Sequence, residues 1–194
     1  EAVRLVEAGG GTSTVLTLGP EAAIEQLRDA MAVGIERAIL LETDGTEWGP
    51  AATASAIADA VRAREAAEGL FDLLLFGNEA ADSADYQVGV RVAAALDRPV
   101  ITGIKRLDVN AGIARAWRER DGAWDVYELA LPAVVTVREG INLPRYPSVP
   151  GRLRARKKDV ERVAENRGPQ VDAELIGLRV PAQADHAVEV LGHG

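Results

Sequence analysis

The residues best suited to chemistry lie in a loop, Gly77 to Gly89 (GNEAADSADYQVG), between a predicted buried strand and a predicted helix. Backbone amides at the start of a helix can hold a phosphate, and Ser83 and Gln87 add hydrogen-bonding groups. Three residues of the loop are carboxylates that oppose a bound phosphate: Glu79, Asp82 and Asp85. Spacing alone therefore favours an acidic, solvated loop in which Asp82, Ser83 or Asp85 caps the helix.

The chain carries no motif of the common nucleotide-dependent enzymes. It contains neither a GxxxxGK[ST] phosphate loop nor a GxGxxG fingerprint. It has no Cys, and its only histidines, His186 and His193, lie close to the C-terminal end. A His-based triad, a cysteine nucleophile and a His-rich metal site are therefore not expected. Glu119 and Asp121 flank a predicted hairpin turn, where carboxylates are usually surface charges, so we predict no catalytic residue and no metal site.

A second segment of interest runs from Leu131 to Lys158, where a short apolar strand, Ala133 to Val137, leads into a loop rich in proline. The prolines recur every three residues, at Pro144, Pro147 and Pro150. This spacing stiffens the loop and reduces the entropy lost when a partner orders it. The segment therefore suggests a docking device.

This loop leads into a cluster of basic residues that contains no acid: Arg145, Arg152, Arg154, Arg156, Lys157 and Lys158. The net charge of the whole chain is −8, and an acidic body is a poor nucleic-acid binder. No aromatic residue between Arg152 and Lys158 offers a surface for base stacking. Two interpretations stay open, a solvated loop or helix start and a contact with an acidic partner.

The composition fits one soluble domain, with room for a C-terminal extension. The chain has 194 residues, of which 47% are apolar and 27% charged. No apolar run approaches the roughly 20 residues of a membrane span, and no signal peptide is evident. The absence of Cys makes a cytoplasmic location the simplest expectation.

Strands and helices alternate through the first half of the chain. The predicted strands are Val15 to Leu18, Ala38 to Leu41, Phe71 to Phe76 and Val100 to Ile104, and the predicted helices are Glu21 to Met31, Ala51 to Glu68 and Gln87 to Leu96. This order predicts a doubly wound, mostly parallel α/β sheet. The apolar run FDLLLF predicts a strand buried on both faces. Ligands of such sheets bind beyond the carboxyl ends of the strands, here after Leu18 and Phe76.

The second half has a different character. Two alternating segments, Ile113 to Glu119 and Trp124 to Leu131, flank Asp121-Gly122 and predict a β-hairpin. The residues after Asp159 contain Gly and Pro between polar pieces and predict an extended tail, with a short helix at 182–191.

The chain resembles the β subunit of electron transfer flavoprotein over most of its length. The resemblance rests on EAVRL at the N-terminal end, the Gly19-Pro20 turn, LLLFGNEAADSADYQVG, the hairpin segment RERDGAWDVYELALPAVVT, INLPRYPSVP and ARKK. The hairpin segment joined to the Pro-Arg-Tyr loop is the specific part. The family begins with a strand and loop ahead of the EAVRL helix, so the resemblance implies that this chain is N-terminally truncated relative to the family and lacks a central strand.

This resemblance implies an adenine-nucleotide-binding, HUP-like α/β fold and a role as an electron-carrier subunit, not an enzyme. The family forms a heterodimer with an α subunit that holds most of the FAD. The β subunit holds AMP, or a second FAD in bifurcating members. The complex carries electrons from flavin-dependent dehydrogenases to a downstream acceptor, meets the membrane only through an acceptor oxidoreductase and binds no nucleic acid. A stand-alone adenine-nucleotide-binding domain of the stress or hydrolase type and a structural protein with a vestigial pocket are the competing hypotheses.

Site residues carried over by position fall into two groups. The nucleotide would be held by Leu18, Gly77, Asn78, Glu79, Ala80, Ala81, Asp82, Ser83, Ala84, Asp85, Tyr86, Gln87 and Val88. Partners would be bound by Glu119, Arg145, Tyr146, Pro147, Ser148, Val149 and Pro150. In the family the carboxylate at Glu119 pairs with an Arg of the mobile flavin domain. Val149 takes the position of the apolar anchor, where Leu is common.

The resemblance also implies a division of the chain. Residues 1–158 would form the nucleotide-binding α/β domain, including the hairpin at 107–137 and a recognition loop at 138–152. Residues 159–194 would form a C-terminal extension that contacts the α subunit.

Overall fold

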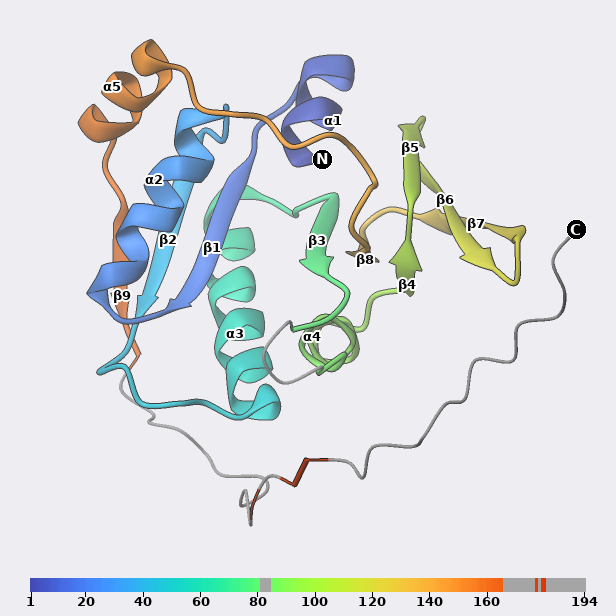
Figure 1. The fold of residues 1–194 in the computed structure, drawn as a ribbon, viewed down its shortest axis with the longest axis horizontal. Coiled ribbons are helices and arrows are strands. Elements are labelled where there is room, and N and C mark those ends of the chain that lie inside the picture. Colours follow the sequence, from blue (N-terminus) through green and yellow to red (C-terminus); the bar gives the residue numbers. More distant parts are fainter. Residues whose placement is uncertain (81–84, 166–176, 178, 181–194) are drawn as a thin grey trace, which may run out of the picture.

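The computed structural model describes residues 1–80, 85–165, 177 and 179–180. Helices and strands alternate in the first half of the chain, five consecutive strands follow, and the strands form three small sheets with helices around them (Figure 1). The elements are α1 (Ala2–Gly9), β1 (Thr14–Gly19), the 3-10 helix η1 (Glu21–Ala23), α2 (Ile24–Ala32), β2 (Arg37–Glu42), α3 (Pro50–Glu68), β3 (Leu73–Gly77), α4 (Val88–Ala95), β4 (Val100–Ile104), β5 (Arg106–Asn110), β6 (Ile113–Arg120), β7 (Ala123–Ala130), β8 (Ala133–Val137), α5 (Val149–Lys157) and β9 (Glu161–Ala164).

Two of the sheets are parallel. One has the order β1-β2-β9 and the other β3-β8-β4, so that β8, late in the sequence, lies between two earlier strands. The predicted doubly wound α/β class is therefore confirmed. The central position of β8 explains its apolar run, because Ala133, Val134 and Val135 are fully buried.

The parallel halves are not joined by hydrogen bonds. Among the described residues β1 pairs only with β2, and β3 pairs only with β8. Helix α3 covers both halves, since its Ile57 packs against a cluster around Ile39 and Leu41 and against a second cluster that includes Leu74 and Phe76. The described residues place no strand between β1 and β3, and the expected central strand stays a prediction.

The free edge of β3 corrects one expectation. The run FDLLLF predicted a strand from Phe71 that is buried on both faces, whereas β3 begins at Leu73 and its apolar residues are only half-buried. An edge strand lacks a neighbour on one side, which leaves part of each side chain accessible.

The short helix α1 contacts both parallel halves of the fold. A Cβ atom on Gly34, in the turn after α2, would lie 2.9 Å from Val3, while Leu5 packs against the core of the second parallel sheet. Arg4 donates a hydrogen bond to the backbone oxygen of Leu107 at 2.5 Å. The amphipathic EAVRL segment is thus a helix, as expected, and it ties distant parts of the fold together.

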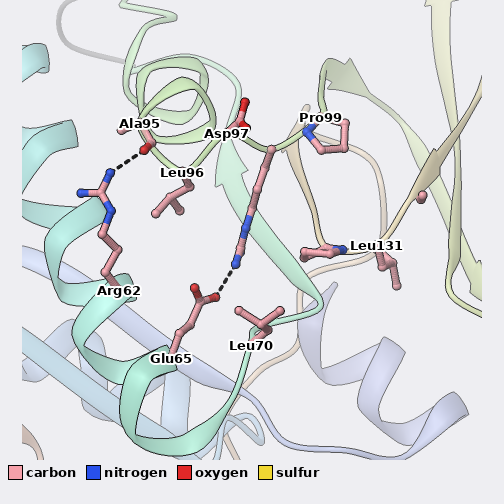
Figure 2. A pocket seen from close by; sticks show the side chains of 11 residues that line it. Arg62, Glu65, Leu70, Ala95, Leu96, Asp97, Pro99 and Leu131 are labelled. Carbon is pink, nitrogen blue, oxygen red and sulfur yellow. Dashed lines mark hydrogen bonds and ion pairs between the residues drawn. The ribbon is translucent and has the colours of Figure 1, made fainter.

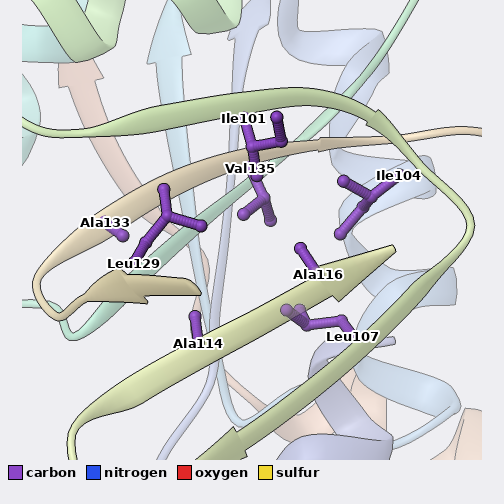
Figure 3. Close-up of a cluster of buried hydrophobic side chains, with 8 residues drawn as sticks. All are labelled: Ile101, Ile104, Leu107, Ala114, Ala116, Leu129, Ala133 and Val135. Atoms are coloured by element: carbon purple, nitrogen blue, oxygen red, sulfur yellow. The ribbon is translucent and has the colours of Figure 1, made fainter. Parts of the chain in front are cut away.

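The third sheet is antiparallel, with the order β5-β6-β7. The predicted hairpin is β6 and β7, and β5 is an additional strand that its polar sequence RLDVN did not indicate. Figure 3 shows how the inner face of this sheet packs on the second parallel sheet. The buried residues of the core between these two sheets are Ile101, Ile104, Leu107, Ala114, Ala116, Leu129, Ala133 and Val135. This core fixes the end of the hairpin beside the ends of β4 and β8.

Two further expectations change at the C-terminal side. Residues 161–164 form β9, parallel to β2, so the extended tail does not begin at Asp159. Helix α5 begins at Val149, so the predicted recognition loop, 138–152, ends at Ser148 and its last four residues are helical. The predicted helix at 182–191, His186 and His193 lie outside the described residues.

Candidate functional site at the carboxyl ends of the second parallel sheet

The carboxyl ends of β3, β8 and β4 come together through a chain of hydrogen bonds centred on Thr136. The backbone amide of Gly103 donates to the Thr136 hydroxyl at 2.9 Å, and that hydroxyl donates to Asn78 Oδ1 at 2.7 Å. The backbone N–H of Asn78 donates to the carbonyl oxygen of Val137 at 3.0 Å. Because Thr136 is only 2% exposed, this arrangement fixes Asn78 at the start of the predicted nucleotide loop.

Helix α4 starts directly above these strand ends, and Gly89 permits the close approach. A Cβ atom on Gly89 would lie 2.9 Å from Thr136 Cγ2 and 3.1 Å from Phe76 Cβ. The N-cap of α4 is Gln87, and no side chain among the described residues caps the helix. Gln87 Oε1 instead accepts hydrogen bonds from Arg91 at 2.9 and 2.7 Å. Within the described part of the chain, the amides of the first turn thus have no side-chain partner, and such amides can hold a ligand.

The described part of the loop contains two internal contacts. Ala80 N donates to the backbone oxygen of Asp85 at 3.0 Å, and the Tyr86 hydroxyl is hydrogen-bonded to the Glu79 carboxylate, which raises the pKa of Tyr86. Asp85 does not cap α4, so that expectation is wrong. The other suggested caps, Asp82 and Ser83, lie outside the described residues together with Ala81 and Ala84.

Leu18 lies in the other half of the sheet, at the carboxyl end of β1. It packs against the cluster around Ile39 and Leu41, and Trp48 packs there as well. The indole N–H of Trp48 is buried and has no hydrogen-bond partner among the described residues. The structure thus brings Gly77, Asn78 and residues 85–88 together, and it places Leu18 on the neighbouring half, in the same hydrophobic cluster as Trp48.

Sequence reasoning missed four residues at this site: Gly103, Arg118, Thr136 and Arg138. Arg138 follows β8 directly, and its position one residue after a buried strand was the available signal. Arg118 comes from β6 and donates to the Tyr127 hydroxyl. Gly103 and Thr136 could not be recognised, because their role depends on which strands are neighbours.

Glu119 is exposed near the end of β6 and already has a partner. Lys105 Nζ donates to Glu119 Oε2 at 2.7 Å. This hydrogen bond is the main reason that the pKa of Glu119 is lowered. A cation from a second molecule would have to share or replace Lys105.

The predicted partner-binding loop is exposed but anchored. Arg145 donates to both carboxylate oxygens of Glu7 in α1, at 2.7 and 2.6 Å. Tyr146 is 91% and Val149 73% exposed. The Ser148 hydroxyl caps α5 by accepting a hydrogen bond from the amide of Gly151 at 3.1 Å. Helix α5 and strand β6, which carries Glu119, lie on opposite sides of the molecule (Figure 1).

The basic cluster lies largely on helix α5, whose last turn carries Arg154, Arg156 and Lys157, and the contact with an acidic partner stays a prediction. Arg28 of α2 donates to the backbone oxygens of Ala155 and Arg156, both at 3.0 Å. Lys158 Nζ donates to backbone oxygens of Ile35 and Glu36. These contacts hold α5 on the body of the protein.

A cavity of about 550 Å³ lies away from this site, at the amino-terminal ends of β4 and β8 (Figure 2). Three of its charged side chains, those of Arg62, Glu65 and Arg98, have partners within the protein. Arg98 and Glu65 form an ion pair at 2.5 Å whose side chains are 6% and 9% exposed. Arg62 donates to the backbone oxygen of Ala95. The cavity thus offers no arrangement for acid–base or nucleophilic chemistry.

The described part of the chain offers neither a metal-binding cluster nor a membrane-spanning helix. No group of three or more His, Cys, Asp or Glu in the described part of the chain could hold a metal ion. No helix among the described residues is long and apolar enough to cross a bilayer.

Comparison with known proteins decides the family. The model of the electron transfer flavoprotein domain matches residues 1–167. The chain belongs to the electron transfer flavoprotein family. It is 39% identical over 163 residues to the electron transfer flavoprotein subunit beta of Bacillus subtilis, which covers 83% of this chain and 62% of that protein. The subunit beta of Thermoanaerobacterium thermosaccharolyticum is 31% identical over 181 residues, 92% of this chain and 67% of its own length. The resemblance to the β subunit is thus confirmed.

The match covers only part of these family members. The subunit beta of Mycobacterium tuberculosis (strain H37Rv) is 36% identical over 151 residues, 77% of this chain and 55% of that protein. The chain therefore spans roughly three fifths of the length of the relatives that it matches. The relatives are named as electron transfer subunits, and the activity and partners of a whole electron transfer flavoprotein come to this chain as proposals.

Proposed function

We propose that this chain serves as the nucleotide-holding and docking subunit of a two-subunit electron carrier. An α subunit holds most of the FAD, which accepts and releases electrons when bound. The chain holds AMP as a structural nucleotide at Leu18 and residues 77–88. The complex takes electrons from flavin-dependent dehydrogenases and passes them to a downstream acceptor, and this chain contributes no catalytic residue. Its cytoplasmic location stays a prediction.

One observation supports nucleotide binding above all others. The first turn of α4, which no described side chain caps, approaches the carboxyl ends of β3 and β8 closely at Gly89. Free amides at a helix start, beyond the carboxyl ends of parallel strands, suit a phosphate group.

The docking role rests on the exposed apolar residues of the loop and of α5. Leu143, Tyr146, Val149 and Leu153 are 89%, 91%, 73% and 55% exposed. Apolar side chains gathered on a stiff, anchored segment favour an interaction surface. The proposed occupant is a flavin-dependent dehydrogenase, with Val149 as the anchor. Glu119, on the other side of the molecule, is proposed to contact a cationic side chain of the α subunit.

The test is to co-express the full reading frame with its candidate α subunit, purify the complex and quantify the nucleotides released on denaturation. One FAD and one AMP per heterodimer are expected. Two FAD would assign the second site to FAD and the protein to the bifurcating type. A complex without AMP or second FAD would overturn nucleotide binding by this chain.

Measuring nucleotide binding by the chain alone tests the competing hypothesis of a stand-alone nucleotide-binding domain. If the chain alone binds or turns over adenine nucleotides and forms no complex with the α subunit, it is a stand-alone nucleotide-binding domain and the carrier role is wrong.

A further inference from the structure

The loop at 138–148, which carries part of the proposed docking surface, has few attachments to the body of the protein. At its start, the backbone amide of Arg138 donates to the last carbonyl oxygen of β4 at 2.9 Å, and Ile141 packs against the core of the second parallel sheet. At its end, Ser148 caps helix α5. Between Ile141 and Ser148, Arg145 is the only residue for which the described part of the chain shows a hydrogen bond.

Arg145 and Glu7 of α1 form an ion pair that we call the loop clamp. The two terminal nitrogens of Arg145 donate to the two carboxylate oxygens of Glu7, at 2.7 and 2.6 Å. Two parallel hydrogen bonds of this kind fix the plane of the guanidinium group, which the point charge of a lysine does not do. The hydrogen bond from Arg145 also lowers the pKa of Glu7, so the carboxylate is ionised at neutral pH. The clamp therefore sets both the position and the direction of the Arg145 side chain.

Helix α1 gives Glu7 a fixed base. Leu5 of α1 packs against the same core cluster as Ile141 at the start of the loop. Arg4 donates a hydrogen bond to a backbone oxygen of β5 at 2.5 Å. Because α1 and the loop share one core, the clamp closes a ring that runs from Ile141 through Arg145 and Glu7 back to that core.

The clamp lies at the surface, so its effect on the stability of the whole fold is small. The side chains of Arg145 and Glu7 are 43% and 57% exposed. Exposed ion pairs shift an equilibrium by about fivefold at most. The middle of the loop has no other hydrogen bond within the described residues, and Tyr146 beside the clamp is almost fully exposed. A shift that is small for the fold is therefore large for the loop.

We infer that Glu7 is a positioning residue of the docking surface, which holds Arg145 and the exposed segment 146–149 in place before a dehydrogenase arrives. This inference rests on the docking role in the proposed function. A loop that is ordered in advance loses less entropy on binding, so the clamp raises affinity and leaves the electron-transfer step unchanged. The guanidinium of Arg145 then serves to hold the loop and does not itself contact the dehydrogenase.

Trypsin tests the clamp directly, in the complex of the full reading frame with its α subunit. Trypsin takes the Arg side chain into its own specificity pocket, so cleavage after Arg145 requires an open clamp. When opening is fast, the cleavage rate follows the open fraction. Glu7→Gln should speed this cleavage about two- to fivefold, as measured by mass spectrometry. The control is Glu21→Gln, which removes an exposed carboxylate from a 2.7 Å contact with Arg162 and should not change the rate.

Electron transfer from a flavin-dependent dehydrogenase of the same organism tests what the clamp does for docking. Glu7→Gln should raise the KM for the complex about two- to fivefold with kcat unchanged, because the clamp acts on binding and not on transfer. Arg145→Gln should have the same effect. The charge swap Glu7→Arg with Arg145→Glu should bring KM back toward the value of the unchanged protein. Glu21→Gln should change neither constant.

The remaining outcomes overturn the inference in different ways. If neither cleavage nor KM changes in Glu7→Gln, the clamp does not hold the loop. If cleavage changes and KM does not, the loop is not positioned for docking. A KM that rises more in Arg145→Gln than in Glu7→Gln, and that the swap does not restore, assigns Arg145 to a direct contact with the dehydrogenase. If no dehydrogenase reduces the unchanged complex while cleavage still depends on Glu7, the proposed function is rejected together with the docking role, and the clamp is only a structural contact.

Discussion

Gly151 of α5 packs directly against the backbone oxygen of Ala32, the last residue of α2. A Cβ atom on Gly151 would lie 2.5 Å from that oxygen, a distance that real Cβ atoms do not adopt. The contact brings α5, and with it the exposed Val149, onto the body of the protein. The presence of glycine at this position therefore sets how the proposed docking surface is presented.

Gly151→Ala should push α5 away from α2 and lower the free energy of unfolding by about 1–3 kcal/mol, because backbone cannot move aside as a flexible side chain can. Chemical denaturation measures the change. Gly9→Ala, in α1, is the matched control, since its Cβ would meet nothing within 4 Å among the described residues. A Gly151→Ala protein as stable as the control would contradict the close packing.

Val149→Asp should reduce electron transfer from a dehydrogenase roughly tenfold or more if the side chain is the buried anchor of that contact. The FAD content of the complex should not change. Aspartate is favourable in the first turn of a helix, so the fold of α5 is preserved. Leu70→Asp is the control, because Leu70 is similarly exposed, at 67% against 73% for Val149. Leu70 lines the cavity shown in Figure 2 and is not part of the proposed docking surface. Equal rates for the two variants would reject the anchor.

Gly89→Ala should lower both stability and nucleotide retention. The new methyl group would meet Thr136 Cγ2 at 2.9 Å and Phe76 at 3.1 Å, so α4 must lift from the strands that hold Asn78. We expect a loss of about 1–3 kcal/mol and a smaller yield of AMP on denaturation. Gly77→Ala is the control, because Gly77 begins the same loop and a Cβ atom there would meet nothing within 4 Å among the described residues. The stability of this variant should stay unchanged. Full AMP retention in Gly89→Ala would separate α4 from the nucleotide site.

Local sequence patterns were sufficient for the alternating strands and helices, because apolar runs and Gly or Pro boundaries act within a few residues. They failed where pairing depends on distant segments. The polar sequences of β5 and β9 gave no strand signal, and the apolar run of β3 did not reveal that it forms a free edge. The site shows the same limit, since Asn78, Gly103 and Arg138 become neighbours only through the strand order β3-β8-β4.

Glu65→Gln should destabilise the fold by about 3–5 kcal/mol, because it leaves the buried guanidinium of Arg98 without its counter-ion. Glu65 also accepts a hydrogen bond from the amide of Phe71 at 2.9 Å, so the pair fixes the turn between α3 and β3. Thermal unfolding with a van't Hoff analysis measures the loss. The control is Glu128→Gln on β7, whose contact with Arg115 is long, at 3.7 Å, and exposed. It should cost less than about 1 kcal/mol. Similar losses for both variants would contradict the special role of the buried pair.

Lys105→Met should raise the pKa of Glu119 toward its ordinary value, because the hydrogen bond from Lys105 is the main cause of the lowered pKa. A carboxyl group whose pKa is lowered in the folded state stabilises the fold above the pKa of the unfolded chain, about 4.3, and loses that contribution as the pH falls through the lowered folded value. The stability difference between the unchanged protein and Lys105→Met should therefore be full at neutral pH and disappear in acid. Carboxyl NMR titration of Glu119, with Lys157→Met as the control for charge, measures the shift. An unchanged titration in Lys105→Met would show that Lys105 does not hold Glu119 in solution.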